Sequence, residues 1–310
     1  MVDVSRPATR EVRTRERVAV VIVTFNRIEV LRRTLATLGE SLNRAPEEII
    51  VVDNASEDGT ADALRTEFSH VHVVRLNINT GPAGGFAAGF REALSRGHDW
   101  IWAFNDDDQP ARPDALTRLL AVAKSQRAAP IGMVGSWLVR TDSTGEPMQV
   151  VETGGFWLRP KAERTIARKS DPYDVDLMSF NGALISSRAV RAAGFPQSDF
   201  FMMMEEYDFC IRLREAGYRL LIVAEPLVQA MALGSAINPP WRGYYQTRNH
   251  LIMALRARSM SEFRRWIERT GKFVVADCLW KDKKLQRLYF RGLATWHAVT
   301  GRSGMTVAPR

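Results

Sequence analysis

Short apolar runs alternate with amphipathic stretches along the first 130 residues. The β-branched run Val18–Thr24 and the run at 48–52 are continuous, which predicts strands buried on both faces. Further strands are expected at 72–76 and 100–104, and apolar residues recur at helical spacing in 28–42, 60–68 and 86–96. Strands that alternate with helices predict an α/β fold, with a mostly parallel central sheet and helices on both faces.

From residue 132 onward the apolar runs become shorter and more irregular. We expect strands at 154–157, 179–186 and 219–223 in a second, mixed part of the sheet, and a short helix at 209–216. Residues 1–17 are polar and rich in arginine, which predicts a flexible N-terminal arm.

Polar and glycine residues follow the predicted strands of the first half. In a parallel sheet these carboxyl ends share one edge, where open α/β folds bind their ligands. The glycine-rich segment 77–85 matches neither the Walker spacing nor the GxGxxG pattern, so we expect its glycines to let a bulky ligand approach the backbone. The residues expected around this crevice are Thr24, Asn26, Asp53, Asn54, Ser56, Gly81, Gly85 and Asp107.

Three consecutive carboxylates, Asp106, Asp107 and Asp108, end the strand expected at 100–104. Adjacent acids raise each other's pKa unless a cation or hydrogen-bond donors offset the repulsion, and Mg2+ and Mn2+ prefer carboxylate oxygens. The alternative is that Asp107 or Asp108 caps a helix at 113–120. The cluster alone does not decide between metal binding and capping.

Composition is that of an ordinary globular protein, with 45% hydrophobic and 25% charged residues. Two cysteines, Cys210 and Cys278, indicate neither a disulfide framework nor a cysteine metal site, which favours a cytoplasmic protein. We expect no transmembrane segment, since no apolar run approaches the roughly 20 residues that a bilayer requires.

Positive charge is concentrated at the C-terminal end. Residues 251–310 contain 13 Lys and Arg against four Asp and Glu, a balance of +9 in a chain whose net charge is +8. Aromatic residues interleave with these cations, which predicts an amphipathic helical tail that contacts anionic lipid at the inner face of the membrane. The alternative is a helical pair that packs its aromatics on the main domain. No nucleic-acid recognition motif accompanies the charge, so we expect no nucleic acid partner.

Five motifs in order make the chain resemble the inverting glycosyltransferases of family 2, which have the GT-A fold. They lie at 23–27, 51–60, 79–86, 105–108 and 205–218, and the resemblance extends from about 18 to 249. It implies a GT-A domain at 18–250, with a nucleotide-binding half at about 18–130 and an acceptor half at about 131–250. The tail at 251–310 would follow it. Within the family, the chain looks most like the galactofuranosyltransferases that start galactan on a lipid-linked acceptor, and rhamnosyltransferases share much of the pattern.

The resemblance implies a role for each motif. Asp53 would contact the nucleotide base, and Asp107, the last acid of the family's Asp-x-Asp unit, would hold Mg2+ or Mn2+ on the diphosphate with help from Asp108. In the acidic pair, Glu206 would be the general base and Glu205 its neighbour. The remaining residues expected to contact the donor are Thr24, Asn26, Arg27, Asn54, Asn79, Gly81, Gly85, Asp106 and Arg248.

Two positions depart from the family pattern. Ala230 stands where a histidine commonly binds the metal or diphosphate, and Asn105 stands at the first position of the Asp-x-Asp unit. Arg248, in a segment that resembles one near the diphosphate, would supply the missing positive charge.

The resemblance implies transfer of a sugar of the galactofuranose or rhamnose class from a UDP- or dTDP-sugar to a glycan or polyprenyl-linked acceptor. One alternative, motivated by Ala230 and Asn105, is a catalytically impaired sugar-nucleotide binder or partner protein. The other is a nucleotidyltransferase, which the absence of a Gly-x-Gly-Thr/Ser-Arg start after the first strand disfavours.

Overall fold

A computed structural model describes residues 15–40, 42–125, 129–141, 147–151, 172–231, 239–279 and 282–309. Residues 1–14 of the expected arm and the strand expected at 154–157 lie outside these ranges. Arg17, at the end of the expected arm, is held by its backbone: its N–H donates to Asp99 at 3.0 Å, and its carbonyl accepts from the amide of Trp100 at 3.1 Å.

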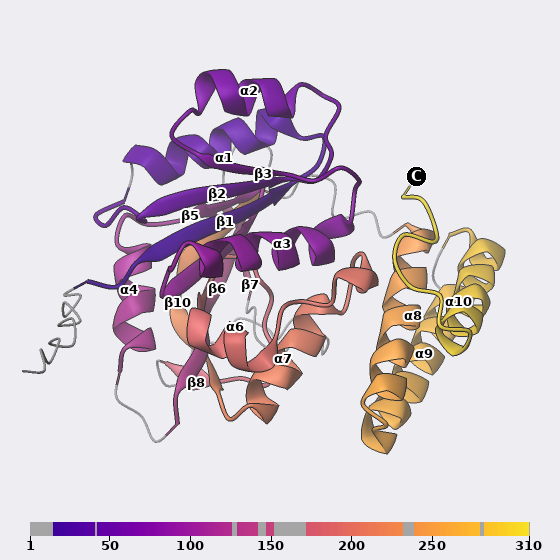
Figure 1. The fold of residues 1–310 in the computed structure, drawn as a ribbon. Helices are drawn as coiled ribbons and strands as arrows, with labels where there is room; N and C mark the ends of the chain where they lie inside the picture. The colour runs from indigo at the N-terminus through magenta and orange to yellow at the C-terminus, as the bar shows by residue number, and fades with distance from the viewer. Residues whose placement is uncertain are drawn as a thin grey trace, which may run out of the picture.

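The first half of the chain alternates strands and helices, as the pattern predicts (Figure 1). Strand boundaries agree with the prediction within a residue, because continuous β-branched runs leave little choice of conformation. The elements are β1 (Val18–Thr24), α1 (Ile28–Glu40), β2 (Glu48–Asp53), α2 (Thr60–Glu67), β3 (His72–Arg75), α3 (Gly81–Ser95) and β4 (Trp100–Asn105).

The second half supplies mixed strands and then helices. It contains β5 (Asp108–Pro110), α4 (Ala115–Ala123), β6 (Ile131–Thr141), β7 (Pro147–Val151), β8 (Tyr173–Asp174), β9 (Ala183–Ser186), α6 (Ser187–Ala193), a 3-10 turn η1 (Ser198–Phe200), α7 (Glu205–Glu215), β10 (Arg219–Met231), α8 (Pro240–Arg256), α9 (Met260–Leu279) and α10 (Lys284–Val299).

One sheet unites the strands in the order β3-β2-β1-β4-β9-β6-β10-β5. Strands β3, β2, β1 and β4 are parallel, β6 pairs parallel with β10, and the short strands β9, β5, β7 and β8 join antiparallel. Alternate residues of β1 face opposite sides: Val20 and Ile22 pack with α1, α2 and α4, whereas Val21 and Val23 pack with α3, α6 and α7. The expected α/β fold with helices on both faces is confirmed.

Helix α3 begins at Gly81, five residues earlier than predicted, and its glycines have a packing role that the sequence did not suggest. A Cβ on Gly85 would lie 2.4 Å from Val23, and one on Gly81 would lie 2.0 Å from the Phe201 carbonyl oxygen. These glycines therefore allow α3 to pack closely on β1 and on the segment after η1. The approach of a bulky ligand to their backbone stays a prediction.

Helices α8, α9 and α10 form an extension beside the α/β body, next to α7 (Figure 1). Buried side chains of α8, such as Leu251 and Ile252, pack with Phe200, Met204 and Tyr207 of the body. Phe263 and Trp266 of α9 stack with ring centroids 5.6 Å apart and pack against the same cluster. Among the described residues, no helix is both long and apolar enough to cross a membrane.

Candidate active site

The carboxyl ends of the parallel strands meet at one edge, and several of the sequence-predicted residues gather there. Thr24 of β1 lies in register with Asp53 of β2, and the Asn54 amide donates to the Thr24 carbonyl at 3.0 Å. The Asn26 side chain accepts from the Glu57 amide at 2.7 Å, and the Ser56 hydroxyl accepts from the Asn26 amide at 2.9 Å. Asn26 has a φ of 52°, a conformation that asparagine tolerates better than most residues.

Asp53 presents a buried carboxylate with an unused oxygen. Its Oδ1 accepts from the Ser56 amide at 2.9 Å, whereas its Oδ2 accepts no hydrogen bond from any residue that the structure describes. The Arg75 guanidinium is 3.8 Å from Oδ2, close enough for attraction but too far for a hydrogen bond. A buried acceptor without a donor is unfavourable, so this oxygen is suited to accept from a ligand.

Asn54 and Asn79 shape the start of α3. The Asn54 side chain donates to the Gly81 carbonyl at 2.9 Å and accepts from the Thr80 amide at 2.9 Å. Asn79 accepts from the Gly81 amide at 2.8 Å. These contacts order the loop between β3 and α3 at the same edge, so both asparagines act here through the backbone of the loop.

The acid cluster is divided among different partners. Asp106 is buried, accepts from the Thr24 hydroxyl at 2.9 Å and pairs with Arg27 at 2.6 Å. Burial raises the pKa of Asp106 to about 7, although the charge of Arg27 opposes the rise. Arg27 also approaches Asp107 at 3.3 Å. The Arg27 guanidinium is therefore a cation that offsets the repulsion between the adjacent carboxylates.

Asp108 lies in β5 and is fully buried. Its carboxylate accepts from the Asn105 amide at 2.8 Å and from the Asn181 side chain at 2.8 Å. Burial, with the charge of Asp107 next, raises its pKa well above the ordinary value. Because α4 begins at Ala115 with Asp114 at the N-cap position, neither Asp107 nor Asp108 caps it, and the capping alternative was wrong.

The three acids differ in how open they are to a cation. The Asp107 side chain is 21% exposed, against 5% for Asp106 and complete burial for Asp108. Among the described residues, no group of three or more His, Cys, Asp and Glu side chains is arranged to hold a metal. Mg2+ in phosphate-transfer sites commonly uses one or two carboxylates, with substrate phosphates and water completing the shell. Asp107 fits that arrangement, whereas Asp108 is turned toward asparagine donors.

Ala230 lies beside the acids. It is the register partner of Asp108 in the β10–β5 pair, and the Met231 amide donates to the Asp107 carbonyl at 3.0 Å. Strand β10 continues to Met231, eight residues beyond the predicted end. The position where the resemblance implies a histidine therefore borders the cluster, and this chain has only a methyl group there.

Glu205, which is buried, and Glu206, which is half-buried, open helix α7. Glu206 accepts from the Phe180 amide at 2.7 Å, whereas Glu205 Oε2 is buried and accepts no hydrogen bond from the described residues. Burial raises the pKa of Glu206 to about 7, and burial and the charge of Glu206 raise that of Glu205 to about 8. The predicted i,i+4 pair forms separately, with Asp208 and Arg212 at 2.7 Å.

The segment before β9 connects the glutamates to the acid cluster. Phe180 donates its amide to Glu206, and its neighbour Asn181 donates its side chain to Asp108. Two adjacent residues therefore link the glutamate pair to the acid cluster. Asn181 was not among the predicted site residues, because its partner lies 73 positions away in sequence.

The Arg248 side chain is surrounded by protein acceptors. Its guanidinium is fully buried and donates to the carbonyls of Phe200 at 3.0 Å and Gly304 at 2.7 Å and to the Thr306 hydroxyl at 2.7 Å. The Tyr245 ring also covers it, 4.9 Å from its centroid. The diphosphate contact expected of Arg248 is incompatible with this placement, because its donors are directed to protein acceptors.

Comparisons with known sequences give one consistent family. The sequence pattern described as Glycosyl transferase family 2 matches residues 19–192. Galactofuranosyltransferase GlfT1 of Mycolicibacterium smegmatis is 31% identical over 205 residues, which are 65% of this chain and 67% of that protein. GlfT1 of Mycobacterium tuberculosis is 29% identical over 207 residues, 65% of this chain and 66% of that one. An undecaprenyl-phosphate mannosyltransferase of Micrococcus luteus is 35% identical over 130 residues, 39% of this chain and 52% of that protein.

Two solved structures share the fold. Residues 1–349 of S. aureus TarS, in complex with UDP-GlcNAc, superpose with a TM-score of 0.60 at 15% identity, covering 91% of this chain and 81% of that one. GalNAc-T7 with UDP, GalNAc and Mn2+ gives a TM-score of 0.61 at 15% identity, covering 94% and 58%. Both are GT-A glycosyltransferases, so the GT-A fold expected from the sequence is confirmed.

Proposed function

Because the chain belongs to glycosyltransferase family 2, we propose that it transfers a sugar from a nucleotide diphosphate donor to a glycan or polyprenyl-linked acceptor, with inversion at the anomeric carbon. A sugar of the galactofuranose class is favoured, because two of its relatives are galactofuranosyltransferases. A UDP-sugar is the preferred donor class, and the reaction takes place at the inner face of the cell membrane.

One observation carries this proposal: the adjacent residues Phe180 and Asn181 bind the candidate base Glu206 and Asp108 of the acid cluster, which links the two acidic centres. An inverting transfer requires a base on the acceptor side of the sugar and charge compensation on the leaving-group side. Neither half of this arrangement alone distinguishes a glycosyltransferase from a nucleotide binder. The two together match the reaction.

Each of these residues has a separate role in the proposed reaction. Asp53 Oδ2 accepts from the nucleotide base, and Arg27 holds Asp106 and Asp107 in place beside the diphosphate. Glu206 accepts the proton of the acceptor hydroxyl as that oxygen attacks, and the nucleoside diphosphate leaves with the bonding electrons. The raised pKa of Glu206, due to burial, makes it a stronger base than an exposed glutamate.

Asp107 would hold Mg2+ or Mn2+, which would neutralise the charge that develops on the departing diphosphate. The ligand set supports this, because Asp107 is the most exposed of the three acids and the diphosphate oxygens would complete the shell. Asp108 is buried and accepts hydrogen bonds from the side chains of Asn105 and Asn181, so its role is to hold the local structure of the acid cluster.

A donor panel tests the proposal most directly. The purified protein is incubated with UDP- and dTDP-sugars, Mn2+ or Mg2+ and a polyprenyl-diphosphate glycan, and the products are read by mass spectrometry. We expect an acceptor extended by one sugar with at least one donor. Nucleotide binding by calorimetry without hydrolysis or transfer across the panel would instead favour the impaired binder, the alternative that Ala230 motivates.

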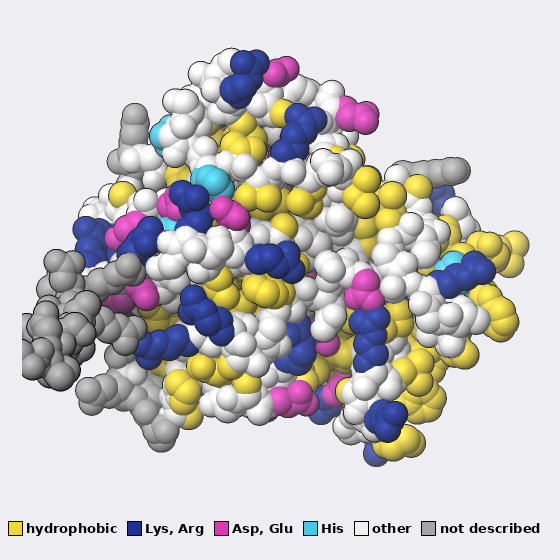
Figure 2. All heavy atoms as spheres, viewed as in Figure 1, with side chains coloured by type: hydrophobic (Ala, Val, Ile, Leu, Met, Phe, Trp, Pro, Cys, Tyr) yellow, Lys and Arg dark blue, Asp and Glu magenta, His cyan; other side chains and the backbone are white. Residues whose placement is uncertain are grey.

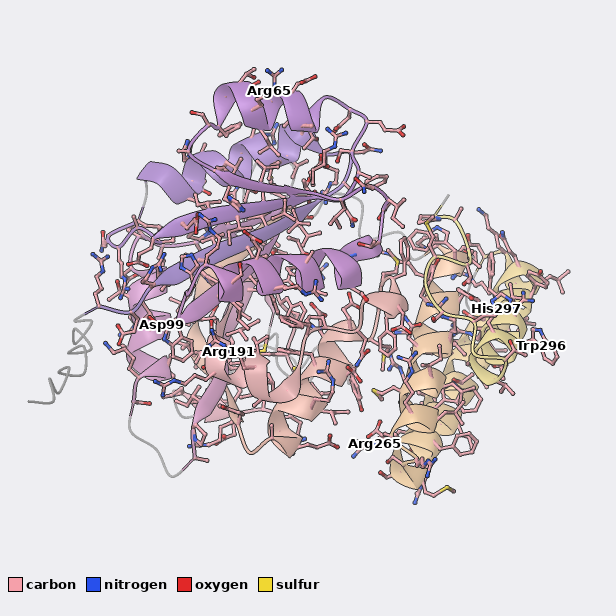
Figure 3. All side chains as sticks on the ribbon, viewed as in Figure 1. Arg65, Asp99, Arg191, Arg265, Trp296 and His297 are labelled. Atoms are coloured by element: carbon pink, nitrogen blue, oxygen red, sulfur yellow. The ribbon has the colours of Figure 1, made fainter. Side chains whose placement is uncertain are left out.

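We further propose that α10 rests on an anionic bilayer. Leu285, Tyr289, Trp296 and Val299 are 85%, 64%, 62% and 66% exposed. At about 100° per residue they share one side of the helix, opposite the buried Arg291 and Ala294. Figure 2 shows hydrophobic side chains exposed over the C-terminal helices, and Trp296 extends from α10 away from the sheet (Figure 3).

Charge supports lipid as the partner of this apolar stripe. Lys283 and Lys284 lie exposed at one end of α10 and Arg302 lies exposed just beyond the other, in a tail with a balance of +9. An exposed apolar helical face with cations at its ends is typical of an interfacial helix. A bilayer surface would bring the site to a polyprenyl-linked acceptor.

Replacing Tyr289 and Trp296 together by glutamate should weaken binding to phosphatidylglycerol vesicles by roughly tenfold or more, since two aromatic contacts are lost and two repulsive charges added. Co-sedimentation measures the change. The matched control is Ile78→Glu, because Ile78 is 70% exposed but lies outside the extension. Unchanged vesicle binding would contradict the lipid contact, and a double variant that turned a dimer into a monomer would assign the stripe to a second copy of the chain.

A further inference from the structure

A strained turn precedes the glutamate pair. Phe201, Met203 and Met204 have φ values of 64°, 65° and 77°, although none is glycine. The Met202 amide donates to the Phe200 carbonyl at 2.8 Å, which closes a three-residue γ-turn on Phe201, whose ψ is −63°. This is the rare, unfavourable form of that turn, and strained non-glycine residues persist only where their surroundings enforce them.

Asn249 of α8 supplies much of that enforcement. Its side-chain nitrogen lies 2.9 Å from the Phe200 carbonyl oxygen and 2.8 Å from those of Met202 and Met203. Its side-chain oxygen accepts from Arg248 Nε at 2.9 Å, which fixes the orientation of the amide. Arg248 Nη2 also donates to the Phe200 carbonyl, so two adjacent residues of α8 bind the turn.

The other side of the turn is held by α3, which belongs to the nucleotide-binding half of the domain. The Ala83 amide, at the start of α3, donates to the Phe201 carbonyl at 3.1 Å. The Phe201 ring is buried and packs on Tyr245 with centroids 5.1 Å apart. The turn therefore lies between α3 and α8, and α7 leaves it directly with Glu205 and Glu206.

The part of α8 that binds the turn is itself fixed by the end of the chain. Arg248 donates to Gly304 and Thr306, and the Tyr245 hydroxyl donates to the Val307 carbonyl at 2.6 Å. These contacts leave α8 little freedom to follow the turn if the turn relaxes. The amide of Asn249 is thus presented by a rigid support.

We propose that Asn249 is a positioning residue for the transfer reaction, whose amide holds the turn at 200–204 in the strained shape that directs Glu206 into the site. The proposal rests on the proposed function, because it takes Glu206 as the base. It assigns to the helical extension a part in the chemistry, through α8 and Asn249.

Asn249→Ala removes the amide and is the direct test. We expect kcat to fall roughly 10- to 100-fold while the donor KM changes little, because a displacement of about 1 Å at a reacting group has effects of this size. The turn should also open, so that the Met202 amide, in the peptide covering 198–206, exchanges with deuterium faster. As Glu206 gains water, the rise of kcat with pH should move to lower pH. The titratable groups that interact with Glu206 are Glu205 and Cys210.

A second substitution separates positioning from general destabilisation. Glycine adopts positive φ readily, so Met203→Gly in the Asn249→Ala background should restore part of the lost kcat. Gln246→Ala, on the same helix, leaves the donors to the turn in place and should behave as wild type. The proposal is overturned if Asn249→Ala keeps the wild-type exchange and pH profile, or if activity falls only in proportion to folded protein with no rescue. If the wild type transferred no sugar, the proposed function would fail. The exchange measurement would still show whether Asn249 holds the turn at 200–204.

Discussion

Glu206→Gln should reduce transfer by roughly 10²- to 10⁴-fold, the range that a positioned general base contributes. Glutamine keeps the size of the side chain and an oxygen that can accept from the Phe180 amide, so the local structure should persist. What is lost is the ability to take the proton of the acceptor hydroxyl. Steady-state kinetics with donor and acceptor measure the fall, and calorimetry should show unchanged nucleotide binding.

The pH profile gives the same prediction a second measurement. Burial raises the pKa of Glu206 to about 7, so the glutamate is protonated and inactive as a base below that pH. The kcat/KM of the wild type should therefore rise as pH increases through about 7, and the rise should be absent from the residual activity of Glu206→Gln. Glu205 and Glu206 are adjacent and both titrate. The pH at which kcat/KM rises therefore reflects the ionisation of the pair and not of Glu206 alone.

Glu215→Gln is the matched control, since Glu215 is an exposed glutamate near the other end of α7. It makes the same chemical change on the same helix, and its activity should equal that of the wild type. Transfer by Glu206→Gln at more than a tenth of the wild-type rate would assign the base to another residue. Glu205, whose Oε2 is buried without a donor among the described residues, would be the next one to test.

The sequence predicts well where local pattern determines structure. β1 was predicted to the residue, because seven consecutive β-branched and small apolar positions fit only a strand buried on both faces. The gathering of Thr24, Asn54 and Asp106 at one edge followed from the order of strands and helices. In both cases the determinants are neighbours in sequence or follow from the rules of parallel sheets.

Contacts between segments far apart in the chain could not be predicted from the sequence. Arg27 was expected at the nucleotide, which stays a prediction, and the structure adds that its guanidinium pairs with Asp106, 79 positions away. Arg248 was expected at the diphosphate, but the end of the chain and η1 surround it with carbonyls. Neither local periodicity nor the motif shows which acceptors surround a cation.

The start of α3 was misplaced for a related reason. Glycine at 81, 84 and 85 and proline at 82 read as a loop, because glycine disfavours helix in isolation. Tertiary packing reverses that preference: the Cβ atoms that better helix formers would add have no room against Val23 and the Phe201 carbonyl. The helix therefore extends through its glycines because the space beside them requires glycine.

Asp107→Asn should abolish the metal dependence of donor binding. The substitution removes the charge of the most exposed acid in the cluster while keeping its shape. A bound cation stabilises developing charge by several kcal/mol, so transfer should fall by about 10²- to 10³-fold. Titration of UDP in the presence and absence of Mn2+ should show tighter binding with the ion for the wild type and no difference for the variant.

Asp114→Asn makes the same change outside the site, where Asp114 pairs with Arg112 at 2.9 Å, and should leave both measurements unchanged. The comparison also tests what Arg27 does. Because Arg27 pairs with Asp106 and approaches Asp107, it already offsets part of the negative charge that a cation would otherwise balance. If the wild type were equally active without divalent ions and Asp107→Asn retained its rate, Arg27 and not a metal would be the counter-charge at the diphosphate. A loss of Mn2+-dependent UDP binding in Asp107→Asn alone would instead place the ion on Asp107, with Arg27 fixing that carboxylate from behind.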